Sequence, residues 1–401
     1  MRVTVNRCHK CYIIMPMIYL DNNATTQIAP EVLRAMMPYL EKAYGNPSSV
    51  HQAGQEARHA VEEARYQVAE FIGCRPAEIT FTSGGTESDN AAIMGVLPGR
   101  AGKKTIIASS VEHSAVREPL SYLAKQGYRI LEIGVNTSGR LDMPALSAAL
   151  ADPDVALLSL IWANNETGVI FDIGTVAALA REHRVIFHVD AVQAAGKIPL
   201  QFSSRGMDLL SISAHKFHGP KGVGVLVVRR GVAFYPFIRG GPQERDRRGG
   251  TENVAGIVGL GAAAARAAGR LADSGNTQRI ASLRDKLEVG ILRSVPESFV
   301  NGDPVSRTCN TTNIGFSSLE AEAILILLNQ HEICASAGAA CSSGSLEPSH
   351  VLKAMGIAEK IAHGSVRFSL SEFTTEAEID QTLHVIPQVI ARLRQVLPVG
   401  R

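Results

Sequence analysis

Polar and charged side chains follow several short apolar runs of this sequence, each at the point where a run ends. A glycine pair followed by a hydroxyl lets backbone N–H groups approach an anion. An aspartate at such a place is costly to bury unless it meets a cation or a donor. An imidazole, an amide and a lysine complete the set. In chain order these residues are Gly85, Thr86, His113, Asn165, Asp190, Ser213, His215 and Lys216.

Together these groups are the parts that hold pyridoxal phosphate. Gly85 and Thr86 would take the phosphate, and Asp190 would keep the pyridine nitrogen protonated, so that the ring withdraws electrons from a substrate Cα. Lys216 would bind the cofactor aldehyde covalently and move the Cα proton. Taken alone, each of these residues could also have a purely structural role, such as forming a tight turn or acting as a structural histidine. Their joint placement is what favours a cofactor site.

Through the middle of the chain, each apolar run is followed by a turn and then by a helical stretch, and this order repeats. Such runs, separated by helices, are typical of a largely parallel sheet covered on both faces. Ligands bind beyond the carboxyl ends of such strands, which is where the groups above stand. The predicted strands are 79–82, 104–109, 128–133, 155–162, 185–190, 208–213 and 223–228, with helices at 87–97 and 115–126.

The chain has 401 residues, more than one ordinary hydrophobic core can organise, and this length predicts two lobes. An Ala-rich helix over 253–271 should bridge them, with the boundary near 273. Beyond it, the stretches 278–292, 309–316, 319–328, 366–370 and 375–397 indicate a smaller α+β set. The predicted division is an N-terminal extension (1–17), a small-domain N-terminal segment (18–28), a large cofactor-binding domain (29–272) and a small C-terminal domain (273–401).

Composition narrows the class of protein. The chain is 45% hydrophobic and 19% charged, with a net charge of +2. That balance argues against a partner such as nucleic acid or an anionic membrane, and no apolar run approaches the roughly 18 residues of a membrane span. Six sparse cysteines do not resemble a disulfide framework, so we expect a reducing, cytoplasmic location. Residues 1–16 lack a secretory cleavage pattern and look like a ragged extension.

Three features of the sequence are less specific. Cys8-His9-Lys10-Cys11 contains a CxxC, but a closed zinc site needs four ligands and no second pair follows, so we favour no metal there. The basic run 239–248 is by default a solvated loop. Cys341 stands in the Ala/Ser/Gly-rich stretch 335–345, which is poor core material; from composition alone it is either a small buried hydrophobe or a functional thiol.

Several long motifs carry a resemblance to a known family. They read YLDNNATT at 19–26, GNPSSVH at 45–51, TSGGTESDN at 82–90, ANNETG at 163–168, DAVQ at 190–193, GGTEN at 249–253 and ACSSGSLEPSH at 340–350. The sequence from Ile18 onward resembles the NifS/IscS-type cysteine desulfurases, of the class V aminotransferase group, and within them the nitrogen-fixation NifS branch. The resemblance implies a pyridoxal-phosphate-dependent transferase of fold type I, with a seven-stranded sheet domain and a smaller α+β domain carrying a mobile Cys loop.

The resemblance also implies residue roles. Lys216 would hold the cofactor, His113 would stack on its ring, Asp190 would meet its nitrogen and Gln193 its phenolic oxygen. Asn165 and Arg367 would bind the substrate carboxylate. The phosphate would be lined by Gly85, Thr86, Ser213 and His215, and Thr251 would reach the phosphate of a neighbouring subunit, which implies a homodimer. The basic run 239–248 leads into Thr251 and would share this intersubunit role.

For Cys341 the resemblance implies the thiolate that takes sulfur from L-cysteine as a persulfide, leaving L-alanine, and also a transient iron–sulfur ligand. The expected acceptor is a NifU-like iron–sulfur scaffold. Two alternatives stay open: a selenocysteine lyase or related class V aminotransferase, and a non-catalytic iron–sulfur assembly scaffold, against which the presence of both Lys216 and Asp190 speaks.

Overall fold

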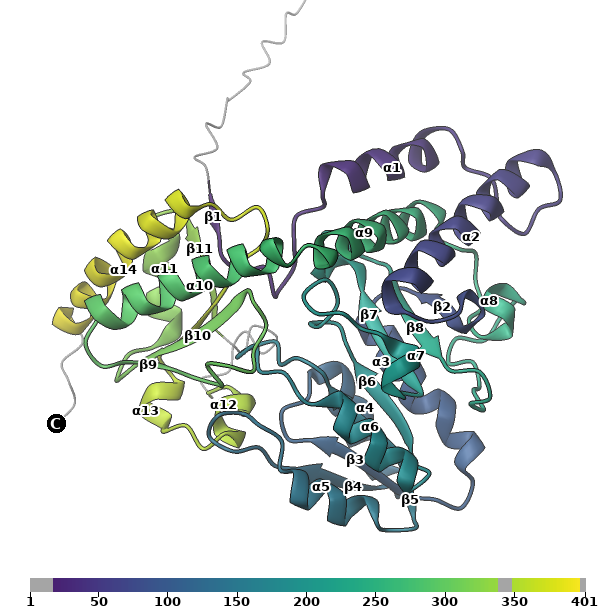
Figure 1. The fold of residues 1–401 in the computed structure, drawn as a ribbon, viewed down its shortest axis with the longest axis horizontal. Coiled ribbons are helices and arrows are strands. Elements are labelled where there is room, and N and C mark those ends of the chain that lie inside the picture. The colour runs from purple at the N-terminus through teal and green to yellow at the C-terminus, as the bar shows by residue number, and fades with distance from the viewer. Residues whose placement is uncertain (1–16, 338–347, 397–401) are drawn as a thin grey trace, which may run out of the picture.

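A seven-stranded sheet forms the centre of the larger half of the molecule (Figure 1). The computed structural model describes residues 17–337 and 348–396. Neighbouring strands pair in parallel, except that β8 runs antiparallel to β7 and to β2. The predicted seven-stranded, mainly parallel sheet is confirmed. In sheet order the strands are β2 (Ile79–Thr82), β8 (Gly224–Val228), β7 (Leu209–Ser213), β6 (Ile186–Asp190), β5 (Val155–Ile161), β3 (Thr105–Ser109) and β4 (Arg129–Ile133).

Helices cover both faces of this sheet, because its strands are apolar on both sides. Every residue of β5 is buried, as expected of a central strand. Ile93 and Leu120 pack on one face, and Leu146, Val176 and Leu260 on the other. The helices are α3 (Gly85–Val96) and α4 (Ser114–Lys125) on the first face, and α2 (Gln52–Ile72), α5 (Met143–Leu150), α6 (Ile173–Glu182) and α9 (Val254–Ala272) on the second.

Two helices that the apolar pattern does not predict, α1 (Pro30–Glu41) and α2, precede β2. Four of the ten buried residues of α2 are alanines, such as Ala57 and Ala64, and Gly54 and Arg65 are buried too, which weakens the apolar periodicity. Its end is clear: Gly73 adopts the left-handed conformation (φ 77°) that closes helices. Both helices pack against α9.

The smaller half has its own core. A four-stranded antiparallel sheet has the order β12-β13-β10-β9, and β1 pairs in parallel with β11. Ile18 and Leu20 join this core, far in sequence from its other members. The elements are β1 (Ile18–Tyr19), α10 (Ser274–Ser294), β9 (Ser298–Val300), β10 (Thr311–Phe316), α11 (Ala321–Asn329), β11 (Ile333–Cys334), β12 (Ser336–Ala337), α12 (His350–Ala354), α13 (Glu359–Ala362), β13 (Ser365–Ser369) and α14 (Glu376–Val396).

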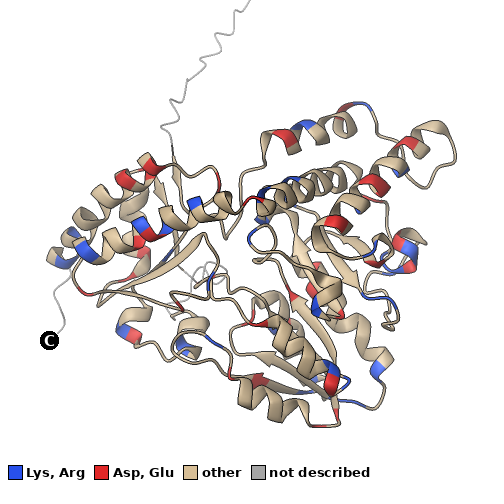
Figure 2. Cartoon of the chain, viewed as in Figure 1, with Lys and Arg blue, Asp and Glu red and all other residues tan. Residues whose placement is uncertain are grey.

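Helix α9 runs beside the boundary between the two halves and continues through Asp273 into α10 (Figure 1). Among the described residues it alone is long and apolar enough to cross a membrane, yet about half of its apolar stretch is buried inside the structure, where it belongs to the core beneath the sheet. Acidic and basic residues are interspersed along the chain in both halves (Figure 2). The remaining short elements are α7 (Phe202–Arg205), α8 (Gln243–Asp246), and the 3-10 turns Pro76–Glu78, Leu97–Arg100 and Ala214–Lys216.

Candidate active site

A cavity of about 360 Å³ opens at the carboxyl ends of the central strands. The loops after β2, β3, β5, β6 and β7 each supply part of its wall, as the parallel topology requires. Arg367, on β13 of the smaller half, closes one side. Of the residues predicted from the sequence, the structure brings together Gly85, Thr86, His113, Asn165, Asp190, Gln193, Ser213, His215, Lys216 and Arg367 around this one cavity.

One end of the cavity is built for an anion. Helix α3 begins at Gly85, next to the Ser213 side chain, and His215 lines the same cavity. Gly84 has φ 152° and ψ −175°, a conformation open essentially only to glycine. A Cβ on Gly85 would come within 2.8 Å of a Val192 methyl. The two glycines therefore keep the helix N-terminus accessible to a ligand.

Asp190 ends β6 at the other side of the cavity, with only 3% of its surface exposed. One oxygen accepts a hydrogen bond from the Val192 N–H at 2.9 Å. Burial raises the pKa of Asp190 to about 6, although the charge of Lys216 opposes this. Its carboxylate is thus stabilised incompletely by the protein, and a protonated ring nitrogen would complete the pairing.

His113 enters the cavity wall as the N-cap of α4. Its Nδ1 accepts a hydrogen bond from the Ala115 N–H at 3.1 Å, so a neutral ring must carry its proton on Nε2. Burial, and then the positive charge of Lys216, lower the pKa of His113 to about 4. At neutral pH this imidazole is therefore an uncharged flat surface held in one orientation by the helix cap.

Lys216 stands in the turn after β7 and reaches back to the N-terminal segment. Its Nζ donates to the carbonyl oxygens of Asn23 at 2.7 Å and Ala24 at 2.9 Å. The Gln193 amide donates to the same Asn23 oxygen at 2.8 Å. Burial, with the charge of Lys216 next, also lowers the pKa of His215 to about 4. Both histidines of the cavity are thus neutral beside the amine.

Arg367 is 2% exposed and lies between the two halves of the molecule. It donates to the Asn165 carbonyl oxygen at 3.0 Å and to an Asp21 carboxylate oxygen at 2.7 Å. Within residues 17–337 and 348–396, its Nε has no hydrogen-bond partner. A buried guanidinium with an unused donor in a cavity wall suits a carboxylate ligand.

Two polar side chains of the cavity, those of Asn23 and Asp89, have no role assigned from the sequence. Asn23 belongs to the YLDNNATT motif, whose length was the signal that it does more than pack. Asp89 is 1% exposed; one of its oxygens lies 3.5 Å from His188 Nε2 and forms no hydrogen bond in the described structure. Burial first, then Asp190, raises the pKa of Asp89 well above its ordinary value. Nothing in its place within α3 could reveal this from sequence.

Other predicted residues lie elsewhere. Thr251 lines a separate hollow near β2, whose Arg248 pairs with Glu87 of α3 at 3.0 Å. Cys341, Cys8 and Cys11 lie outside the described residues. Among the residues that the structure does describe, there is no cluster of three His, Cys, Asp or Glu side chains suited to a metal.

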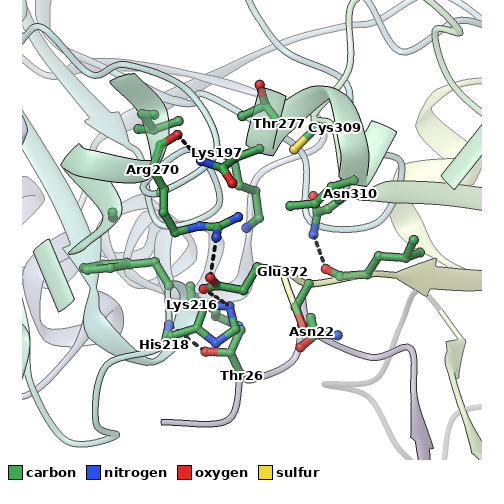
Figure 3. A pocket seen from close by; sticks show the side chains of 18 of the residues that line it. Asn22, Thr26, Lys197, Lys216, His218, Arg270, Thr277, Cys309, Asn310 and Glu372 are labelled. Atoms are coloured by element: carbon green, nitrogen blue, oxygen red, sulfur yellow. Dashed lines mark hydrogen bonds and ion pairs between the residues drawn. The ribbon is translucent and has the colours of Figure 1, made fainter. Parts of the chain in front are cut away.

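A second, smaller cavity of about 50 Å³ lies behind Lys216, and we call it the ion-pair cavity (Figure 3). Glu372 extends into it with a 5% exposed side chain. Its carboxylate binds Arg266, Arg270 at 2.6 Å and His218 at 3.3 Å. The wall also includes Lys197, Lys216 and Cys309.

Comparison with known proteins agrees with this architecture. The Aminotransferase class-V family matches residues 18–382, and the chain belongs to that family. It is 52% identical to Cysteine desulfurase 2 of Trichormus variabilis over 96% of each chain. It is 50% identical to Cysteine desulfurase NifS of Azotobacter vinelandii, over 95% of this chain and 94% of that one. A solved NifS-like protein superposes with a TM-score of 0.88 at 37% identity, covering 94% of this chain and all of the other.

Members of this family are pyridoxal phosphate enzymes, and the cavity fits that cofactor. The open helix N-terminus suits the phosphate, and the incompletely stabilised Asp190 suits a protonated ring nitrogen. The neutral His113 offers a flat surface for the ring, and Lys216 supplies the amine. The pyridoxal phosphate prediction is confirmed.

Proposed function

We propose that this chain is a cysteine desulfurase that converts L-cysteine to L-alanine and takes the sulfur onto Cys341. The observation that carries the proposal is the convergence of Lys216, Asp190, His113 and the α3 N-terminus on one cavity, closed by Arg367. Pyridoxal phosphate, when bound, supplies an electron sink for the substrate Cα. Relatives about 50% identical over nearly the whole chain bear the name cysteine desulfurase.

The chain's own residues have distinct tasks in this proposal. Arg367 and Asn165 hold the substrate carboxylate, which orients the Cα–H bond toward the cavity. Lys216 binds the cofactor and moves the Cα proton. Its amine lines the same cavity as Asp190, which would meet the cofactor ring. His113 keeps its position through the α4 cap and stays uncharged, so that it adds no repulsion to the cation at Lys216.

Cys341 attacks the substrate sulfur. A bond forms between the two sulfur atoms while the carbon–sulfur bond breaks, and its electron pair stays on carbon, which is then protonated to give alanine. One thiol and cysteine become one persulfide and alanine, so no outside oxidant is needed.

The described residues on either side of Cys341 support its access to the site. Ser336 pairs with Arg367 in the small sheet. His350 bonds the Glu112 carbonyl oxygen at 3.0 Å, next to His113. Cys341 comes four positions after Ala337 in the sequence, and an extended chain spans at most about 14 Å over that interval. Both neighbouring segments are thus anchored at the cavity wall.

The test is the variant Cys341→Ala. Because Lys216 and the cofactor cavity are untouched, it should keep the visible absorbance of bound pyridoxal phosphate but lose sulfide release by a factor on the order of 10³. Alanine and sulfide are measured with cysteine and a thiol reductant, without any keto acid. Cys334→Ala is the matched control and should retain activity. Undiminished sulfide output from Cys341→Ala would remove that thiol from the mechanism.

We further propose that the enzyme is a cytoplasmic homodimer whose persulfide passes to a NifU-like iron–sulfur scaffold, with Cys341 as a transient cluster ligand. Similarity to Azotobacter NifS supports a role in nitrogenase maturation. The separate position of Thr251, away from its own chain's cavity, supports a contribution to a neighbouring subunit. Light scattering that gives the mass of one chain, or labelled sulfur that never reaches such a scaffold, would contradict these proposals.

A further inference from the structure

Lys197 lies in the wall of the ion-pair cavity (Figure 3). It follows Gln193 by four residues in the turn after β6. Its Nζ donates to the backbone oxygen of Gln193 at 3.0 Å and to the side-chain Oε1 at 2.9 Å. One ammonium therefore binds both oxygens of the same glutamine.

This contact determines which way the Gln193 amide faces. The Asn23 carbonyl oxygen can only accept a hydrogen bond, so the Gln193 NH₂ group faces Asn23, and the amide oxygen faces the Lys197 amine, which donates to it. One N–H of that group donates to the Asn23 carbonyl oxygen at 2.8 Å, where Lys216 also donates. The second N–H of the amide is left for a ligand in the cavity that Gln193 lines.

Burying the Lys197 amine in these surroundings costs free energy, so a purely structural role would not explain a lysine here. Burial first, and then the neighbouring Lys216 charge, lowers its pKa to about 7, and Arg367 acts in the same direction. A buried amine beside two other cations is unfavourable unless its donors are used. The two oxygens of Gln193 are the acceptors that use them.

We propose that Lys197 is a positioning residue for the cofactor: it fixes the Gln193 amide so that its NH₂ group donates to the phenolic oxygen of pyridoxal phosphate. The inference rests on the role proposed for Gln193. Lys197 itself need not touch the cofactor or the substrate.

The experiment measures pyridoxal phosphate affinity and the visible absorbance maximum of the loaded protein. Lys197→Met should weaken cofactor binding about tenfold, the worth of one hydrogen bond to the ring, and shift the absorbance maximum. Lys197→Arg keeps a donor-only cation, for which the adjacent 50 Å³ cavity gives room, and should bind within about threefold of the native protein. Lys125→Met, an exposed position on α4, is the matched control.

A double-mutant cycle separates positioning from a general structural role. If Lys197 acts through Gln193, then Lys197→Met should change cofactor affinity less than about twofold in a Gln193→Ala background. An equal loss in both backgrounds, or native affinity and absorbance in Lys197→Met, would overturn the inference while leaving the desulfurase proposal in place. A native protein that binds no pyridoxal phosphate would instead refute the proposed function.

Discussion

Lys216 lies in the wall of two cavities whose polar groups are satisfied to different degrees. In the cofactor cavity, Arg367 Nε and one Asp89 oxygen have no hydrogen-bond partner within the described ranges, and burial raises the pKa of Asp190 to about 6. In the ion-pair cavity, Glu372 is bound by two arginines and a histidine.

The difference separates a ligand site from a structural one. Buried polar groups are normally paired within the protein, so a cavity where several are not is one that a ligand completes. Glu372 has no such need: it follows β13 and binds α9, so its ion pairs join the smaller half to the larger. Substitutions in the two cavities should therefore have opposite consequences for stability and function.

The largest effect should come from Lys216→Ala, which removes the amine that holds the cofactor. Sulfide production should fall by a factor on the order of 10³ or more, and the visible absorbance band should disappear. Spectra and product assays after incubation with pyridoxal phosphate measure both. The control is Lys125→Ala. Retention of the visible band in Lys216→Ala would place the cofactor on another amine.

Next in size is Glu372→Gln, which removes the carboxylate that Arg266 and Arg270 share and leaves Arg266 only its pair with Glu31. The free energy of unfolding, measured with urea, should fall by on the order of 3–5 kcal/mol, because one partner of a buried ion pair is removed. Glu376→Gln makes the same change in an exposed pair with Lys286 and should have a much smaller effect. Equal losses for the two variants would mean that the ion-pair cavity contributes no special stability.

Asp190→Asn, by contrast, should raise the free energy of unfolding of the cofactor-free protein. The folded-state pKa, about 6, is above the ordinary value of 3.8, so ionisation of Asp190 costs stability as pH rises between about 4 and 6. At pH 8 the variant should be more stable by on the order of 2–3 kcal/mol, yet bind pyridoxal phosphate more weakly.

The same variant carries its own control at low pH. At pH 4, where Asp190 is largely protonated, unfolding free energies of variant and native protein should agree. A variant that is less stable than the native protein at pH 8 would show that the cavity already satisfies this carboxylate.

Much of the fold followed from local patterns. The strand that ends at Asp190 and the helix that begins beside Gly85 were predictable because apolar runs and glycine turns are local signals. Helix α2 was missed, since alanines on its buried face gave little contrast with its polar side. The Lys197–Gln193 contact was also missed, because four-residue spacing in a turn does not indicate a hydrogen bond.

The sequence by itself determined the order of the strands along the chain and the residue types at their carboxyl ends, and through its long motifs the family and cofactor. Only the tertiary structure decided that Arg367 faces Asn165, more than two hundred residues away, and that Lys216 separates two cavities. The physical reason is that burial and long-range pairing set the protonation of Asp190 and His113. Neither burial nor long-range pairing can be read from the residues adjacent in sequence.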